Sequence, residues 1–347
     1  MQSIVISRPG GYDALRLVEQ PEPEPGPGEV VIACEACGVN YADGIIRMGL
    51  YASAKKLHGY PITPGFEVAG RVAAVGPGVD GRVPGEPVIG LTLFNGYADR
   101  LKLPAEGVFA RPARLDSLQA ATVPTVFLTA WWMVHRQVHP VPGETWLVHS
   151  AAGGVGSALL QLARLAGVRA IGVVGAPHKR EHALAMGADE VVDKSRASPW
   201  PELERLAPEG FHAVFDANGV GTLRQSYAHL APTGKLVVYG FHSMLPRGGR
   251  PNPLTLARDW LRTPRFNPLR MTQENRSVLA ANLSFLQSHA PSLRAGMLWL
   301  LERFADGRLR PLPVESYPLA EAAKAQQRLE SGQTIGKLAL IPQEAAR

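Results

Sequence analysis

The sequence predicts an α/β protein that combines a small antiparallel β-barrel with a doubly wound parallel sheet. At 347 residues, the chain exceeds the roughly 250–300 residues at which single cores stop growing, so we expect two domains. Its first third contains short β-branched runs separated by Gly and Pro, and from about Thr122 strands alternate with helical patterns. The first pattern is typical of antiparallel strands, and the second indicates βαβ units and a parallel sheet.

Each part of the chain supplies elements to this prediction. The Pro- and Gly-rich stretch 21–28 must be a loop, because Pro lacks the N–H group that a sheet requires. The expected barrel strands span residues 30–32, 68–75 and 88–91. The expected strands of the parallel sheet span 145–149, 169–174, 190–192, 212–216 and 235–239, with helices at 157–166 and 183–186. Helices near 293–305 and 319–329 precede a last strand at 337–341.

The composition is that of a globular protein, with 46% hydrophobic and 19% charged residues. No apolar run approaches the ~20 residues that a membrane helix needs, and the first residues lack the features of a secretory signal. We therefore expect a cytosolic, cytoplasmic protein.

The net charge of +6 is modest, and its densest basic stretch runs from Arg247 to Arg276. We interpret this stretch as a solvated surface. The alternatives are a lip for an anionic substrate and a peripheral contact with acidic lipid headgroups. No nucleic-acid-binding motif accompanies the charge, so no nucleic-acid partner is expected.

The two cysteines, Cys34 and Cys37, form a CxxC pattern. A redox motif normally lies at a helix N-terminus, whereas these residues lie on or just after an apolar strand. We interpret them as small, half-buried side chains.

A dinucleotide fingerprint of the GxGxxG type follows the first predicted strand of the parallel sheet, with Ala151 in the first position. Glycine is needed here because a Cβ atom would block the approach of the backbone to a pyrophosphate, whose charge then lies at the positive end of a helix. The pyrophosphate-binding residues are expected to be Ala152, Gly153, Gly154, Val155 and Gly156. A ligand-free glycine turn is the alternative, but the strand and helix on either side favour a cofactor site.

The second strand of the parallel sheet indicates which nicotinamide nucleotide binds. NAD sites generally end this strand in Asp or Glu, which holds the ribose 2′-hydroxyl. Here the strand runs into Gly175, and the cations Lys179 and Arg180 follow. A 2′-phosphate fits this pattern better than a hydroxyl, so NADPH is the expected cofactor.

With these motifs in place, the chain resembles zinc-independent medium-chain dehydrogenases/reductases, namely quinone oxidoreductases and, more closely, the vesicle amine transport protein-like branch. The resemblance covers nearly the whole chain. It rests on the segments Gly38–Asp43, Arg47–Tyr51, Pro64–Gly70, Phe127–Ala130, His149–Gly156 and Gly234–Gly240, and for the vesicle branch on Asn252–Trp260 and Glu274–Arg276.

This resemblance implies a GroES-like barrel, a Rossmann domain inserted after it, and a C-terminal segment that returns to the barrel. The expected bounds are 1–122, 123–262 and 263–347. It also implies that Asn40 and Thr129 border the nicotinamide and that Gly175, Lys179 and Lys194 hold the adenosine 2′-phosphate. Further cofactor contacts are expected at Asn218, Gly240, Phe241, Ser243 and Lys337. Relatives pair through the edge of the Rossmann sheet, so a homodimer is expected.

The metal ligands of zinc-dependent relatives are replaced in this chain. Asn40 stands where they have cysteine, and Phe66 where they have histidine. Glu67 alone cannot form the three-ligand site that catalytic zinc requires. His58, His135, His139 and His149 show no metal-binding spacing and are interpreted as surface or capping residues.

Without a Lewis acid, the easiest hydride acceptors are quinones and conjugated enones. The sequence therefore predicts NADPH-dependent reduction of such a small molecule, with Asn40, Tyr41 and Tyr51 as candidate catalytic residues that stabilise or protonate the product. Packing is an equal alternative for both tyrosines. Two other functions stay open: an enoyl-thioester reductase, and a nucleotide-binding protein that contacts membranes or partners with little catalysis.

Overall fold

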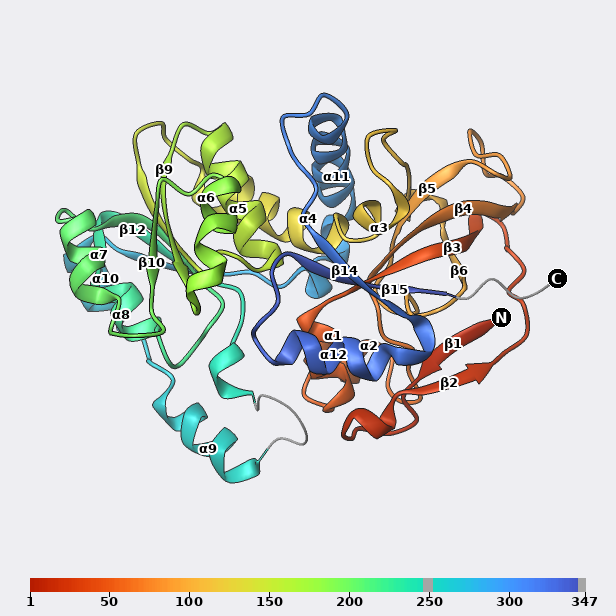
Figure 1. The fold of residues 1–347 in the computed structure, drawn as a ribbon, viewed down its shortest axis with the longest axis horizontal. Helices are drawn as coiled ribbons and strands as arrows, with labels where there is room; N and C mark the ends of the chain where they lie inside the picture. The colour runs from red at the N-terminus through yellow and green to blue at the C-terminus, as the bar shows by residue number, and fades with distance from the viewer. Residues whose placement is uncertain (246–251, 343–347) are drawn as a thin grey trace. The chain divides into compact units, whose positions relative to one another are not determined.

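The computed structural model describes residues 1–245 and 252–342, which form two compact units (Figure 1). The first unit takes in residues 1–128 and the segment from Ser284 onward, and the second takes in most of the chain between them. The divisions after 128 and before 284 lie later than the predicted 122 and 263. The first one is not marked by a loop, because helix α4 (Pro124–Trp132) runs through it.

The first unit is built on a mostly antiparallel sheet in which the long strand β3 (Glu29–Val39) is central. β3 pairs with β4 (Glu67–Val75), β6 (Arg100–Pro104) and β15 (Lys337–Ile341). The other strands are β5 (Pro87–Leu91), β7 (Val108–Ala110) and β14 (Val314–Pro318), with β1 (Gln2–Val5) and β2 (Arg16–Glu19) forming a separate hairpin. The C-terminal strand therefore completes the sheet that the first third of the chain begins.

Both cysteines lie within β3, which continues beyond the predicted strand to Val39. Cys34 and Cys37 are buried, 8% and 0% exposed, and the Cys37 thiol donates to the carbonyl of Ala98 at 3.4 Å. The hydrogen bond with Cys37 and burial both raise the pKa of Cys34. Both are small interior side chains, and they are more buried than predicted.

A buried ion pair joins two helices of the first unit, α1 (Tyr41–Arg47) and α12 (Ala322–Glu330). The Arg47 guanidinium is fully buried and lies 2.7 Å from a carboxylate oxygen of Glu330. Gln326 accepts from Arg47 Nε at 2.8 Å, and the Tyr12 hydroxyl donates to Glu330 at 2.5 Å. The other helices of this unit include α2 (Ala52–Leu57), α3 (Ser117–Ala120) and α11 (Ala290–Ala305).

The second unit contains six parallel strands in the order β10-β9-β8-β11-β12-β13. They span Thr145–His149 (β8), Arg169–Val174 (β9), Glu190–Asp193 (β10), Phe211–Asp216 (β11), Leu230–Val238 (β12) and Ser277–Ala280 (β13). Because the chain starts in the middle and winds outward in both directions, this is the strand order of a Rossmann fold.

Helices cover both faces of this sheet, which confirms the doubly wound prediction. α5 (Gly154–Leu165) and α6 (Arg180–Ala185) pack against β8, β9 and β10. Leu203 of α7 (Trp200–Leu206) and Leu223 of α8 (Leu223–Ala228) join a second core with Ile171 and Val173 of β9. Two more helices, α9 (Pro253–Arg262) and α10 (Pro268–Glu274), follow β12.

Removing Glu330 is expected to destabilise the protein strongly. Glu330→Ala leaves the Arg47 guanidinium buried without its counter-ion, at an expected cost of about 3–5 kcal/mol in the free energy of unfolding. Glu321→Ala is the matched control, because its pair with Lys324 is exposed and should contribute less than about 1 kcal/mol. Equal losses in urea denaturation of the two variants would contradict the interpretation.

Candidate active site

The glycine turn between β8 and α5 has the geometry that a close ligand approach requires. Ser150 adopts a left-handed conformation with φ of 54°, and Gly153 caps α5. A Cβ atom on Gly156 would lie 2.4 Å from the Ser150 carbonyl oxygen, so only glycine allows the helix to start this close to the strand. The turn and the first turn of α5 contain all five predicted pyrophosphate-binding residues: Ala152, Gly153, Gly154, Val155 and Gly156.

The ends of β9 and β10 bring Gly175 and Lys194 side by side. The backbone N–H of Lys194 donates to the Val174 carbonyl at 3.0 Å, and a Cβ atom on Gly175 would lie 4.0 Å from Lys194 Cε. Lys179 follows in the short turn before α6. The Arg180 guanidinium donates to the backbone carbonyl of Val191 and is therefore engaged by the protein itself. Lys179 and Lys194 are the two lysines that follow the ends of β9 and β10.

Asp216, at the end of β11, organises the neighbouring loop. Its carboxylate accepts from the backbone N–H groups of Asn218 at 2.8 Å and Gly219 at 3.1 Å, and from the Thr222 hydroxyl at 2.7 Å. The Asn218 side chain accepts from the Ser150 hydroxyl at 3.3 Å, which links this loop to the glycine turn. The Asn218 amide nitrogen is buried without a hydrogen-bond partner, so the loop carries an unsatisfied donor.

The loop after β12 forms hydrogen bonds with the loop after β11. Ser243 N–H donates to the Asn218 carbonyl at 2.8 Å, and the Ser243 hydroxyl accepts from Gly221 N–H at 3.1 Å. A Cβ atom on Gly240 would lie 2.8 Å from the Ala217 carbonyl, and Phe241 is 43% exposed beside this contact. The predicted cofactor residues of the two loops, Asn218, Gly240, Phe241 and Ser243, therefore form one edge.

These features fit a nicotinamide dinucleotide phosphate. The pyrophosphate would meet the Cβ-free turn and the N-terminus of α5, a helix of 12 residues. Parallel strands of this kind bind nucleotides at their carboxyl ends, where all of these residues lie. The 2′-phosphate would meet Lys194 and Lys179 beside Gly175, where the strand end carries no carboxylate side chain and a Cβ atom would lie 4.0 Å from Lys194 Cε.

His149, the last residue of β8, is completely buried, so the prediction of a surface or capping residue was wrong for it. Its Nε2 lies 3.1 Å from the Ser226 hydroxyl, which itself donates to Asp216 at 2.7 Å. Since the hydroxyl proton is used on Asp216, His149 donates through Nε2, and its buried Nδ1 has no partner. Burial lowers the pKa of His149 to about 4, so the ring is neutral. The hydrophobic strand before it hid this role in the sequence.

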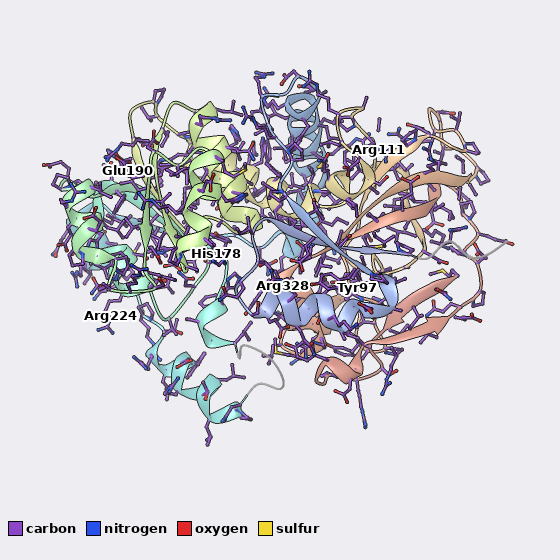
Figure 2. The ribbon with its side chains drawn as sticks, in the orientation of Figure 1. Tyr97, Arg111, His178, Glu190, Arg224 and Arg328 are labelled. Carbon is purple, nitrogen blue, oxygen red and sulfur yellow. The ribbon has the colours of Figure 1, made fainter. Side chains whose placement is uncertain are left out.

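In the first unit, Asn40 caps helix α1 and joins a buried polar network. Its backbone N–H donates to the Asp43 carboxylate at 2.7 Å, which is one half of a capping box. Its side-chain nitrogen donates to Glu67 at 2.8 Å, and its side-chain oxygen accepts from the Lys337 ammonium at 2.6 Å. Tyr97, labelled in Figure 2, donates to Asp43 at 2.9 Å. Burial raises the pKa of Asp43 to about 7 against these donors.

The remaining predicted site residues are buried or half-buried, and all but one lie in the first unit. Lys337 is 4% exposed and bound within the network of Asn40. Tyr51 is half-buried; its hydroxyl lies 2.8 Å from that of Ser284, and its ring meets the edge of Phe66 at 6.0 Å. Tyr41 begins α1 and is half-buried. Thr129, half-buried in α4, begins the second unit, whereas these other residues belong to the first.

The position of the missing zinc ligand is filled by an aromatic cluster. Phe66 is 6% exposed and packs against Tyr51 and against Phe94, whose ring centroid lies 5.8 Å away. Among residues 1–245 and 252–342, no group of three or more His, Cys, Asp or Glu side chains could hold a metal ion.

A hollow of about 410 Å³ opens in the second unit and is lined by Val220, Arg224, Arg262 and Pro264. Neither arginine has an ion pair or hydrogen bond within the part of the chain that the structure describes. Arg224 is labelled in Figure 2. Two unpaired guanidinium groups at one hollow favour an anion there.

The rest of the basic stretch is partly neutralised. Arg258 pairs with Asp259 at 2.9 Å, and Arg270 pairs with Glu274 at 2.6 Å. Arg247 and Arg250 lie outside the described residues. No helix within the described ranges has both the length and the apolar character to cross a membrane.

Two family descriptions match the chain. "Alcohol dehydrogenase GroES-like domain" matches residues 26–125, and "Zinc-binding dehydrogenase" matches residues 154–287. The synaptic vesicle membrane protein VAT-1 homolog of Rattus norvegicus is 32% identical over 346 residues, which cover 99% of this chain and 84% of that protein.

Solved structures with the same fold include two reductases. The quinone oxidoreductase of Escherichia coli, complexed with NADPH, is 27% identical with a TM-score of 0.85, and the match covers 99% of this chain and 100% of that one. The CurK enoyl reductase is 27% identical with a TM-score of 0.83 and 99% coverage of both chains.

The buried neutral ring of His149 predicts a pH dependence of stability. The pKa falls from its ordinary value of 6.5 in the unfolded chain to about 4 in the folded one. Between these values the unfolded state binds the extra proton, so stability is lost as the pH falls from 6.5 towards 4.

We expect this histidine to contribute a loss of about 2 kcal/mol between pH 7 and pH 5 in urea denaturation. His149→Gln should remove that part of the acid sensitivity, whereas His58→Gln, at an exposed histidine, should leave it unchanged. The assignment fails if the two variants lose stability in parallel with the parent.

Proposed function

The chain belongs to the medium-chain dehydrogenase/reductase superfamily, in the family of the VAT-1 homologues, and from that premise we propose that it is an NADPH-dependent, zinc-independent reductase of quinones or activated enones. The observation that carries the proposal is the strand end at Gly175, which has no carboxylate where an NAD site has one and is followed by the cations Lys179 and Lys194. The NADPH named for the quinone oxidoreductase of Escherichia coli supports the same cofactor.

The cofactor, when bound, supplies a hydride, and the protein supplies binding, orientation and charge stabilisation. The glycine turn and the N-terminus of α5 bind the pyrophosphate through backbone N–H groups. Lys194 and Lys179 bind the 2′-phosphate, and the Asn218 amide, which lacks a partner, provides a further donor at this edge. Thr129 remains proposed as a residue near the nicotinamide, and Lys337 is proposed to act there through Asn40 and not by direct contact with the cofactor.

The substrate end of the mechanism uses residues of the first unit. A quinone or enone gains negative charge on oxygen when it accepts hydride, and a fixed N–H donor such as the Asn40 amide stabilises that charge. The hydroxyl of Tyr51 or Tyr41 protonates the product, or water does. The aromatic cluster around Phe66 gives the site an apolar wall that suits flat, conjugated substrates.

Cofactor choice can be tested at the strand end. Lys194→Ala is expected to weaken NADPH binding about 10- to 100-fold, because a charge-assisted hydrogen bond is lost, and to change NADH binding less than about twofold. Gly175→Asp, for which the backbone leaves space, is expected to favour NADH instead. Arg196→Ala, at an exposed cation two residues further on, is the control in a fluorescence titration. Equal weakening of both nucleotides by Lys194→Ala would overturn the assignment.

A second candidate function is reduction of enoyl thioesters, and the arginine hollow favours it. Arg224 and Arg262 would bind the phosphates of a thioester carrier, which a simple quinone lacks. The CurK enoyl reductase has the same fold and supports this class.

One substrate panel separates the two functions. NADPH consumption is measured with 1,4-benzoquinone, methyl vinyl ketone, crotonyl-CoA and the crotonyl thioester of N-acetylcysteamine. The first proposal expects the quinone or the enone to react fastest, and it fails if only thioesters react. If the protein reduces enoyl thioesters, crotonyl-CoA should react faster than its phosphate-free analogue. The double variant Arg224→Ala/Arg262→Ala should then reduce this preference at least tenfold. An unchanged preference would rule the hollow out as a carrier site.

A cytoplasmic location, a homodimer and peripheral contact with membranes remain part of this proposal. The modest charge of the chain and the partly neutralised basic stretch favour a small-molecule substrate over a membrane as its main partner.

A further inference from the structure

The Lys337 ammonium is fully used inside the protein. Its three donors meet three acceptors: the carbonyl of Val39 at 2.8 Å, the side-chain oxygen of Asn40 at 2.6 Å and a carboxylate oxygen of Glu67 at 2.9 Å. Lys337 is 4% exposed and Glu67 is completely buried. Since no donor is left for a ligand, any effect of this cation on the site must pass through one of these three partners.

Two of the three polar side chains, Lys337 and Glu67, come from the strands on either side of β3, and Asn40 directly follows β3. Lys337 begins β15 and Glu67 begins β4, and both strands pair with β3, which ends just before Asn40. The second oxygen of Glu67 accepts from the backbone N–H of Thr125 at 2.6 Å. Both carboxylate oxygens are therefore occupied, and the pair is held by backbone as well as by charge.

The ion pair fixes the orientation of the Asn40 amide. The amide oxygen faces the ammonium, and the amide nitrogen donates to the carboxylate at 2.8 Å. A reversed amide would place its N–H groups against the ammonium and its oxygen against the carboxylate, so both charges disfavour it. One N–H is used on Glu67, and the other makes only a 3.5 Å contact with the Thr125 hydroxyl, at the limit of a hydrogen bond.

We propose that Lys337 and Glu67 are positioning residues, which orient and polarise the Asn40 amide so that its second N–H donates to the oxygen of the substrate. A cation at the amide oxygen draws electron density from the nitrogen and makes the N–H a stronger donor. The amide stays neutral, no proton leaves the pair, and no bond is made or broken in it. This inference rests on the proposed function, because it assigns the donor for the substrate oxygen of that reaction.

The alternative is that the pair only holds β15 in the sheet. The two readings differ in what happens when Asn40 is absent. A positioning pair has nothing to act on in the Asn40→Ala background, whereas a structural pair affects that background as much as the parent.

The test uses a charge-balanced variant, because Lys337→Met alone would leave Glu67 buried without a counter-ion and could prevent folding. The double variant Lys337→Met/Glu67→Gln is made in two backgrounds of the full-length protein, the parent and Asn40→Ala. The exposed pair Lys324→Met/Glu321→Gln is the control. Thermal unfolding and NADPH affinity are measured for each variant.

Single-turnover reduction of 1,4-benzoquinone and methyl vinyl ketone gives the kinetic readout. In the parent background, the balanced variant should lower the rate about 10- to 100-fold with NADPH affinity unchanged, as expected for a weakened transition-state donor. In the Asn40→Ala background, it should lower the rate less than about twofold. An equal loss in both backgrounds, or no loss in the parent, overturns the inference.

A second readout does not depend on turnover. In protein labelled with ¹⁵N-asparagine, the Asn40 side-chain protons are identified by their absence in Asn40→Ala. The chemical shifts of these protons should lie downfield in the parent and move upfield in the balanced variant. They should not change in the control variant. Unchanged positions overturn the inference. A parent that reduces neither acceptor, yet shows the expected shift, contradicts the proposed function and retains the oriented amide.

Discussion

The buried ion pair between Lys337 and Glu67 is the interaction on which the first unit depends. Two charges removed from water are tolerated only when each of their polar atoms finds a partner. Here the partners come from β3, from the start of α4 and from Asn40. The pair is therefore fully satisfied only when all of these elements are in their native positions. The return of the chain to the first sheet through β15 is therefore a requirement of charge compensation as well as of strand pairing.

The two units solve different recognition problems with different physics. The second unit presents backbone N–H groups and cations at the carboxyl ends of parallel strands, which suits a phosphate-rich ligand. The first unit holds a neutral amide beside the buried pair of Lys337 and Glu67, and it contains an aromatic cluster around Phe66. A neutral donor in dry surroundings suits a substrate that becomes charged only as it reacts, because the uncharged substrate is not held too tightly.

Local patterns predicted the fold well, and long-range contacts explain what they missed. The strands Thr145–His149 and Arg169–Val174 match their predicted bounds, because buried parallel strands are continuous apolar runs bounded by turns. The glycine turn could also be predicted, because its glycines lie within a few residues of one another in the sequence. By contrast, Glu67 and Lys337 are 270 positions apart, and Arg47 and Glu330 are 283 apart. No spacing rule links such residues, so neither pair could be found before the sheet was known.

The placement of β15 also bears on how the chain folds as it leaves the ribosome. Glu67 is synthesised 270 residues before the lysine that neutralises it, and the whole second unit is made in the interval. The second unit can therefore fold as soon as its own strands emerge, while the first must wait with a carboxylate and the edge of β3 uncovered. Domain-by-domain folding in this protein runs against the order of synthesis, and the exposed edge is the segment that a chaperone would have to protect in the meantime.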